Sequence, residues 1–261
     1  MKFEIKETKV ESEISTEPKS VEESTFVVTQ LPSRFVPYEG VSKLYYRPYK
    51  YKEILALSDS KLDLEAKVNT ILSGVNGIKD PYTLILPDLE YLSLQRYLAS
   101  FGQLPKIRFY YKCKKCGNEI EKTLKKEELT FEELKVDKLP FKIKGFSVDV
   151  EFTYPDLRKM IKYWNLPQEQ KDRDEVKKAL YVYNKTIEEA VDLLVSNCTL
   201  NDFLTLEQLD RYLYCGLSPV EFICDKCESV YNVIPALGEE GLLILPFRSQ
   251  EDFIGNRIQF E

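Results

Sequence analysis

Two Cys-x-x-Cys pairs constrain this chain more than any other feature of its sequence. Cys113 and Cys116 form the first pair, and Cys224 and Cys227 form the second. A gap of two residues lets one tight turn direct two thiolates at the same ion, and Zn²⁺ binds four thiolates tetrahedrally in closed structural sites. We therefore expect the four cysteines to bind one structural zinc ion.

The distance between the pairs is unusual for such a site. Residues 117–223 separate them, whereas about 15–20 residues do so in a compact ribbon of this type. Strand-like runs flank both pairs, at 106–112 and 119–124 for the first and at 222–223 and 229–234 for the second. The sequence thus predicts an α+β fold with a split Cys₄ zinc ribbon made of two β-hairpins.

The remaining segments predict an N-terminal helical region and a mainly helical insertion between the cysteine pairs. Residues 1–30 are polar and have too few large apolar side chains to offset the entropy cost of ordering. The predicted organisation is a flexible N-terminal arm at 1–30, an α-rich region at 31–105, the split zinc ribbon with the C-terminal region at 106–126 and 218–261, and the inserted helical region at 127–217.

Local signals refine this prediction at four places. Two prolines predict an extended segment over Leu31–Tyr38. Helical patterns continue over about 169–183, and the capping-box patterns beginning at Thr186 and Thr205 predict two further helix starts.

Composition excludes several classes of function. The chain has no histidine, which removes Ser-His-Asp and Cys-His catalysis and histidine-ligated catalytic zinc. It contains no glycine-rich phosphate loop and no run of 18 apolar residues, so we expect no enzyme, no small-molecule substrate and no membrane span. The start of the chain lacks the apolar core of a signal peptide. A net charge of −6 argues against a general nucleic-acid binder.

Alternatives to a structural zinc site remain open at this stage. The cysteines could be small buried hydrophobes or a redox dithiol. Lysines gather near the first pair and could make the ribbon a nucleic-acid-binding regulator, although Glu119, Glu121, Glu127 and Glu128 interleave with them, as on a solvated surface. These lysines are Lys112, Lys114, Lys115, Lys122, Lys125 and Lys126.

Aromatic residues suggest where a partner could bind. The chain has 17 tyrosines and 14 phenylalanines, many for so polar a sequence, and tyrosine is favoured at interfaces because it joins an apolar ring to a polar tip. Tyr38, Tyr45, Tyr46 and the adjacent Arg47 are the predicted partner-binding residues. The same tyrosines could equally be ordinary core aromatics.

A series of short motifs resembles a known family. In order along the chain these are Leu31-Pro32-Ser33 after the polar arm, Tyr46-Arg47-Pro48-Tyr49 before a helix, a helix ending in Phe101-Gly102, and a strand leading into Cys113, Cys116 and Gly117. This order is similar to the baseplate hub assembly proteins of T-even-like contractile-tailed phages, over about residues 31–125, and the second cysteine pair fits too. The helical insertion departs from the family pattern.

The resemblance implies a structural or assembly role in the tail baseplate of the virion, without catalysis. It also implies contacts with other phage tail and baseplate proteins, and synthesis in the host cytoplasm.

Overall fold

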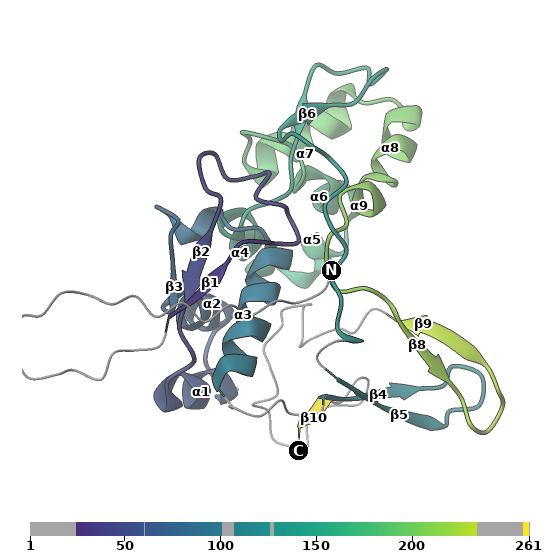
Figure 1. Cartoon of the computed structure of the whole chain (residues 1–261). Helices are drawn as coiled ribbons and strands as arrows, with labels where there is room; N and C mark the ends of the chain where they lie inside the picture. Colours follow the sequence, from purple (N-terminus) through teal and green to yellow (C-terminus); the bar gives the residue numbers. More distant parts are fainter. Residues whose placement is uncertain (1–24, 60, 101–106, 126–127, 234–257, 261) are drawn as a thin grey trace, which may run out of the picture.

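The computed structural model describes residues 25–59, 61–100, 107–125, 128–233 and 258–260. Helices and small antiparallel sheets are mixed along the chain, so the protein is of the α+β class (Figure 1). Within these residues, no helix is both long enough and apolar enough to cross a bilayer.

A three-stranded sheet opens the folded region, with β2 between β1 and β3. Its strands are β1 (Phe26–Val28), β2 (Leu44–Tyr46) and β3 (Val75–Asn76). Phe26 faces Tyr46 across the β1–β2 ladder, and their rings stack at 5.3 Å. Residues 26–28 were predicted to belong to the flexible arm, but here they pair within the chain.

Three helices and a 3₁₀ turn pack against this sheet. They are α1 (Tyr51–Ser58), α2 (Leu64–Leu72), η1 (Pro81–Thr83) and α3 (Leu86–Ser100). Asp63 caps α2 by accepting a hydrogen bond from the Ala66 N–H at 2.7 Å. Helix α3 is buried along most of its length, and the N-terminal sheet, α1 and α2 lie beside it (Figure 1).

Residues 31–38 form successive tight turns, so the prediction of an extended segment was wrong. Backbone hydrogen bonds close these turns, such as the one from Arg34 N–H to Leu31 O at 2.9 Å. Arg34 and Phe35 have φ angles of 56° and 61°, in the left-handed region that non-glycine residues rarely adopt. Buried contacts with α3, described below, hold the segment in this shape.

Two β-hairpins that are far apart in the sequence lie next to each other in the structure. The first joins β4 (Ile107–Lys112) to β5 (Glu119–Leu124), and β10 (Ile258–Phe260) pairs with the free side of β4. The second joins β8 (Val220–Ile223) to β9 (Val230–Val233). The two hairpins lie side by side, and the Lys122 Nζ donates to the Glu221 carbonyl at 2.8 Å (Figure 1).

The segment between the hairpins contains a short β-ladder and several helices. It contains a short ladder of β6 (Phe141–Lys142) and β7 (Glu151–Phe152), then α4 (Leu157–Trp164), α5 (Gln168–Lys171), α6 (Asp174–Ala179), α7 (Ile187–Asn197), α8 (Leu200–Leu206) and α9 (Leu209–Tyr212). The helical pattern of 169–183 is interrupted between α5 and α6 and ends at Ala179.

The capping-box predictions had different outcomes. The box of Thr186 and Glu189 is confirmed at the start of α7. The prediction at Thr205 was wrong, because Thr205 lies inside α8, and Thr199 and Asp202 form the capping box of that helix instead.

Buried apolar side chains form two clusters. One joins the N-terminal sheet, α1–α3 and both hairpins, and the other lies mainly within residues 134–215. The clusters adjoin where α4 begins, since the Leu157 N–H donates to the Leu84 carbonyl at 2.9 Å and Ile85 belongs to the second cluster. The inserted segment therefore has its own core and is attached beside the start of α3.

A buried ion group stabilises the first cluster. The Glu53 carboxylate lies 2.6 Å from Arg47 Nη2 and 3.1 Å from Arg96 Nη2, and the Arg96 side chain has no exposed surface. Burial alone would raise the pKa of Glu53, but Arg47, the Lys50 N–H, Ser73 and Arg96 together lower it to about 2. The carboxylate is thus ionised in the folded state at all but strongly acidic pH.

Replacing Glu53 tests this group. Glu53→Gln should lower the unfolding free energy by about 3 kcal/mol at neutral pH, because it leaves Arg96 buried without a counter-charge. The wild-type contribution is present above the unfolded pKa of about 4.3 and is lost as the pH falls toward the folded value. Urea unfolding should therefore show that the difference in unfolding free energy between the wild type and Glu53→Gln becomes smaller as the pH is lowered. Equal stability of Glu53→Gln and the exposed control Glu65→Gln at neutral pH would contradict this.

Candidate metal centre

Each cysteine pair sits in the tight turn of one hairpin. In the first turn the Cys113 N–H donates to the Asn118 carbonyl at 2.7 Å, and the Gly117 N–H donates to the Cys113 carbonyl at 2.8 Å. The second turn repeats this pattern, with Cys224 bonded to Ser229 at 3.0 Å and Glu228 bonded to Cys224 at 2.8 Å. Two copies of one turn therefore present the four sulfurs.

The turns differ at one backbone position. Gly117 has a φ of 72°, a left-handed conformation that costs glycine little. The equivalent residue in the second turn is Glu228, with a φ of 57°. The second turn thus adopts the same backbone despite a side chain that disfavours it.

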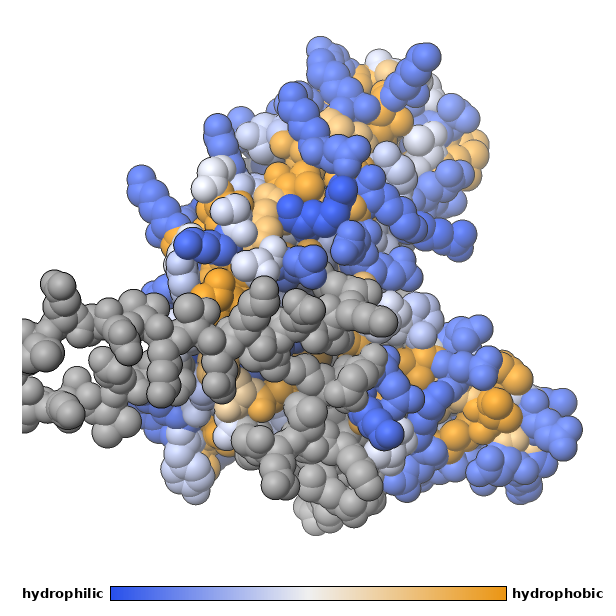
Figure 2. All heavy atoms as spheres, in the orientation of Figure 1, coloured by the Kyte–Doolittle hydropathy of each residue, from blue (hydrophilic) through white to orange (hydrophobic). Residues whose placement is uncertain are grey.

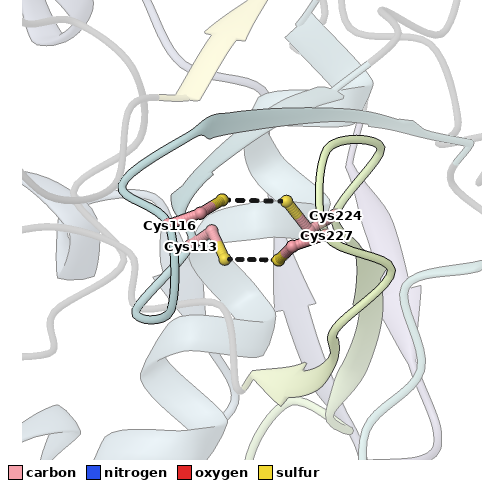
Figure 3. Close-up of side chains that lie close together, drawn as sticks. All are labelled: Cys113, Cys116, Cys224 and Cys227. Carbon is pink, nitrogen blue, oxygen red and sulfur yellow. Dashed lines mark hydrogen bonds between the residues drawn. The ribbon is translucent and has the colours of Figure 1, made fainter.

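The two turns face each other and bring all four cysteines together (Figure 3). Cys113 Sγ lies 3.5 Å from Cys227 Sγ, and Cys116 Sγ lies 3.5 Å from Cys224 Sγ. All four sulfurs lie within 4.8 Å of one another. A disulfide requires about 2.05 Å between sulfurs, whereas ligands at the Zn–S distance of about 2.3 Å on a tetrahedron are about 3.8 Å apart. The spacing fits a shared ion and excludes a disulfide in this structure.

Hydrogen bonds and burial shift the pKa values of three of the four thiols in different directions. The hydrogen bond with the Tyr231 hydroxyl lowers the pKa of Cys113 to about 6. The contact with Ser229 lowers the pKa of Cys227. A hydrogen bond from the Asn118 backbone lowers the pKa of Cys116, but burial and the other three sulfurs together raise it to about 12. A bound cation would be needed to hold Cys116 as a thiolate at neutral pH.

Tyr231 and Ser229 support the sulfurs, and the sequence did not single them out. The Tyr231 hydroxyl lies 3.2 Å from Cys113 Sγ and accepts a hydrogen bond from the Lys115 N–H at 3.2 Å. The Tyr231 ring also packs 5.1 Å from the Tyr111 ring. Ser229 Oγ lies 3.3 Å from Cys227 Sγ. One tyrosine of the second hairpin therefore contacts both the ligand turn and the strand of the first.

The cysteine group is the one potential metal site with three or more ligands found in the described part of the chain. Cys113 and Cys224 are buried, and Cys116 and Cys227 are half-buried. Four protein sulfurs would complete a tetrahedral shell and leave no open position for a substrate. The arrangement is suited to holding a structure together.

Two predicted partner-binding residues lie in the core. Tyr38 and Tyr46 are only 5% and 3% exposed. The Tyr38 hydroxyl donates to Asp88 Oδ2 at 2.5 Å, and Asp88 Oδ1 accepts the Ser33 N–H at 3.0 Å. Burial raises the pKa of Asp88 to about 6 despite these bonds. The two tyrosines thus belong to the interior of this chain.

The other two predicted residues are half-buried. Arg47 binds both oxygens of Glu53 through its guanidinium, and the Lys43 ammonium lies 5.6 Å from the ring centroid of Tyr45. Partner binding by Tyr45 and Arg47 stays a prediction, whereas the side chains of Tyr38 and Tyr46 are buried within this chain.

Comparison with known proteins gives one family match. The family described as T4 bacteriophage base plate protein matches residues 24–189, well over half of the chain. The matched residues include the first cysteine pair and end before the second. The comparisons with curated proteins and with solved structures give no significant match.

Substitutions at the left-handed residue of each turn should have different effects on stability. Gly117→Ala should lower the unfolding free energy by about 1 kcal/mol, because a Cβ disfavours this φ even though it would meet no atom within 4 Å. Glu228→Gly should raise the unfolding free energy or leave it unchanged, for the same backbone reason. Urea unfolding of the full chain measures both. Destabilisation by Glu228→Gly comparable to that by Gly117→Ala would contradict the equivalence of the turns.

Proposed function

The chain belongs to the family of T4 bacteriophage base plate proteins, and from this premise we propose that it is a structural or assembly component of the hub in a contractile tail baseplate. The family supports a structural role in the tail baseplate of the virion. The position in the hub is proposed in addition to the family match, which names the base plate alone. The protein would be made in the host cytoplasm and act through contacts with other tail and baseplate proteins, with no small-molecule substrate.

We further propose that the cysteine centre binds one structural Zn²⁺. The observation that carries this proposal is the convergence of four sulfurs, from turns separated by residues 117–223, within 4.8 Å. A donor set made only of thiolates favours soft or borderline metals, and Zn²⁺ accepts a tetrahedral shell without redox chemistry. With zinc bound, the two hairpins would form a split zinc ribbon.

Such a site would fix the two ends of the inserted segment. β5 leads into the segment and β8 leads out of it, so joining their hairpins joins its ends. The segment has its own core and meets the N-terminal region beside Leu84 and Leu157. Zinc would thereby keep the helical segment in one orientation relative to the rest of the chain, which suits a component of a rigid assembly.

A zinc-ribbon nucleic-acid-binding regulator is the alternative. Lys112, Lys114 and Lys115 are exposed around the first turn, as such a function would require. Glu119 and Glu121 are also exposed on the same hairpin, so this surface carries both signs of charge. Mixed charge is a weaker match to a phosphate backbone than a continuous basic face.

Metal content tests the zinc proposal. Full-length protein purified without chelator should contain about one zinc per chain, and Cys224→Ser should lose the metal and unfold at lower urea concentration, because metal binding contributes folding free energy. Cys198→Ser, a half-buried cysteine outside the centre, is the matched control and should retain zinc. Wild-type protein without zinc would overturn the proposal.

Co-purification tests the baseplate role. Tagged full-length chain, expressed together with the other baseplate proteins of the same phage, should retain one or more of them through washes at physiological salt. Binding to DNA that weakens steeply with salt, with no retained tail protein, would instead support the nucleic-acid alternative.

A further inference from the structure

The side of α7 that faces away from the core combines acidic residues with an exposed apolar one. Ala190 and Leu194 are fully buried and mark the core side. Glu188, Asp192 and Val195 follow at spacings of four and three residues, which places them together on the opposite side. Val195 is 59% exposed.

Helix α8 repeats this pattern directly after a short connection. Leu206 and Asp202 are buried against the protein. Leu200 and Leu204 lie one turn apart on the other side, with exposures of 78% and 50%, and Glu207 follows one turn later. An amphipathic helix normally turns its leucines inward, so two outward leucines in one short helix leave an apolar surface uncovered.

We call the outward residues of α7 and α8 together the acidic helix face. It consists of Glu188, Asp192, Val195, Leu200, Leu204 and Glu207. Figure 2 shows hydrophobic side chains exposed at the edge of the molecule where α8 lies in Figure 1, bordered by hydrophilic ones.

The charge of this face has one sign. Between Thr186 and Gln208 the chain has five carboxylates and no lysine or arginine. Asp202 is used within the fold, since it completes the capping box of α8 with Thr199 and accepts the Ser147 N–H at 3.0 Å. Among the described residues, Glu188, Asp192 and Glu207 form no ion pair. The uncovered apolar side chains thus lie on the same helices as carboxylates that form no ion pair within the described residues.

We propose that the acidic helix face binds a basic amphipathic helix of another protein in the baseplate. Apolar side chains of that helix would cover Val195, Leu200 and Leu204, and its lysines or arginines would pair with the bordering carboxylates. Charge complementarity of this kind directs association and selects the partner. The inference rests on the chain acting through protein contacts, as proposed above, but it does not require the metal.

The charge also argues against two other occupants. A second copy bound through the same face would place carboxylates against carboxylates, because a two-fold interface is self-complementary. An anionic membrane surface would repel the face for the same reason. A basic helical segment satisfies both the apolar and the charged parts.

A peptide probe tests the chemistry on the full-length chain. The probe is a labelled synthetic helix with leucines at positions i, i+3, i+4 and i+7 flanked by lysines, and the matched probe carries glutamates in place of the lysines. Fluorescence anisotropy should show at least about tenfold tighter binding of the lysine probe. The combined variant Glu188→Gln, Asp192→Gln and Glu207→Gln should weaken that binding and reduce its salt dependence.

A second variant separates this face from exposed apolar residues in general. Leu200→Ser with Leu204→Ser should weaken binding of the lysine probe by about tenfold. Tyr51→Ser with Leu55→Ser, an exposed pair at the same spacing on α1, should leave it unchanged. The proposal would be overturned if the lysine and glutamate probes bound equally well. It would also be overturned if the α8 and α1 variants weakened binding of the lysine probe equally. All variants lie outside the cysteine centre, so this result is independent of the zinc measurement.

Cross-linking identifies the occupant in the assembled particle. A photo-reactive phenylalanine analogue replaces Leu204 in the full-length chain expressed during phage infection, and mass spectrometry identifies the cross-linked segment. A segment of another baseplate protein with excess lysine and arginine and apolar residues at helical spacing would support the proposal. A cross-link to a second copy of this chain, to an acidic segment or to lipid would overturn it, as would particles that contain the chain but show no cross-link from position 204.

Discussion

The crowding of four thiols into one small volume is the constraint on which the rest of this structure depends. Sulfurs from two hairpin turns lie within 4.8 Å of one another, a distance at which four thiolates would repel one another strongly without a cation. Burial of Cys113 and Cys224 adds to that cost. The same turns place Tyr111, Phe222 and Tyr231 in contact between the hairpins, so the site and the packing around it depend on each other.

The paired hairpins are connected to both clusters of buried apolar side chains. The hairpins belong to the first cluster together with the N-terminal sheet and α3, and they enclose in sequence the segment that forms the second. A second attachment beside α3 joins Leu157 to Leu84. The segment is thus connected at its ends and at α4, which leaves the outward sides of α7 and α8 available for contacts with other proteins. In the proposed baseplate role, these fixed surfaces would make the contacts with other tail proteins.

Local chemistry explains which features could be predicted from the sequence. Cys-x-x-Cys spacing encodes a turn, and the repetition of that turn indicated that the four cysteines would lie together. The Thr186 and Glu189 pair likewise encodes a helix start within four residues. The shape of residues 31–38 could not be predicted in this way, because it depends on Asp88, which binds the Ser33 N–H and the Tyr38 hydroxyl from 50 or more residues away. The role of Asp202 was also missed. It completes the capping box of α8 with Thr199, and it accepts a hydrogen bond from the distant Ser147 N–H, which the sequence does not reveal. Tyr231 was missed because its role depends on how the hairpins face each other.

X-ray absorption spectroscopy at the zinc K-edge of the full-length protein tests the central claim most directly. If the four cysteines bind zinc, the first shell should consist of about four sulfur atoms at about 2.3 Å, with no nitrogen or oxygen ligand. A shell containing nitrogen or oxygen donors, or a metal-free protein whose cysteines are still close together, would contradict the account.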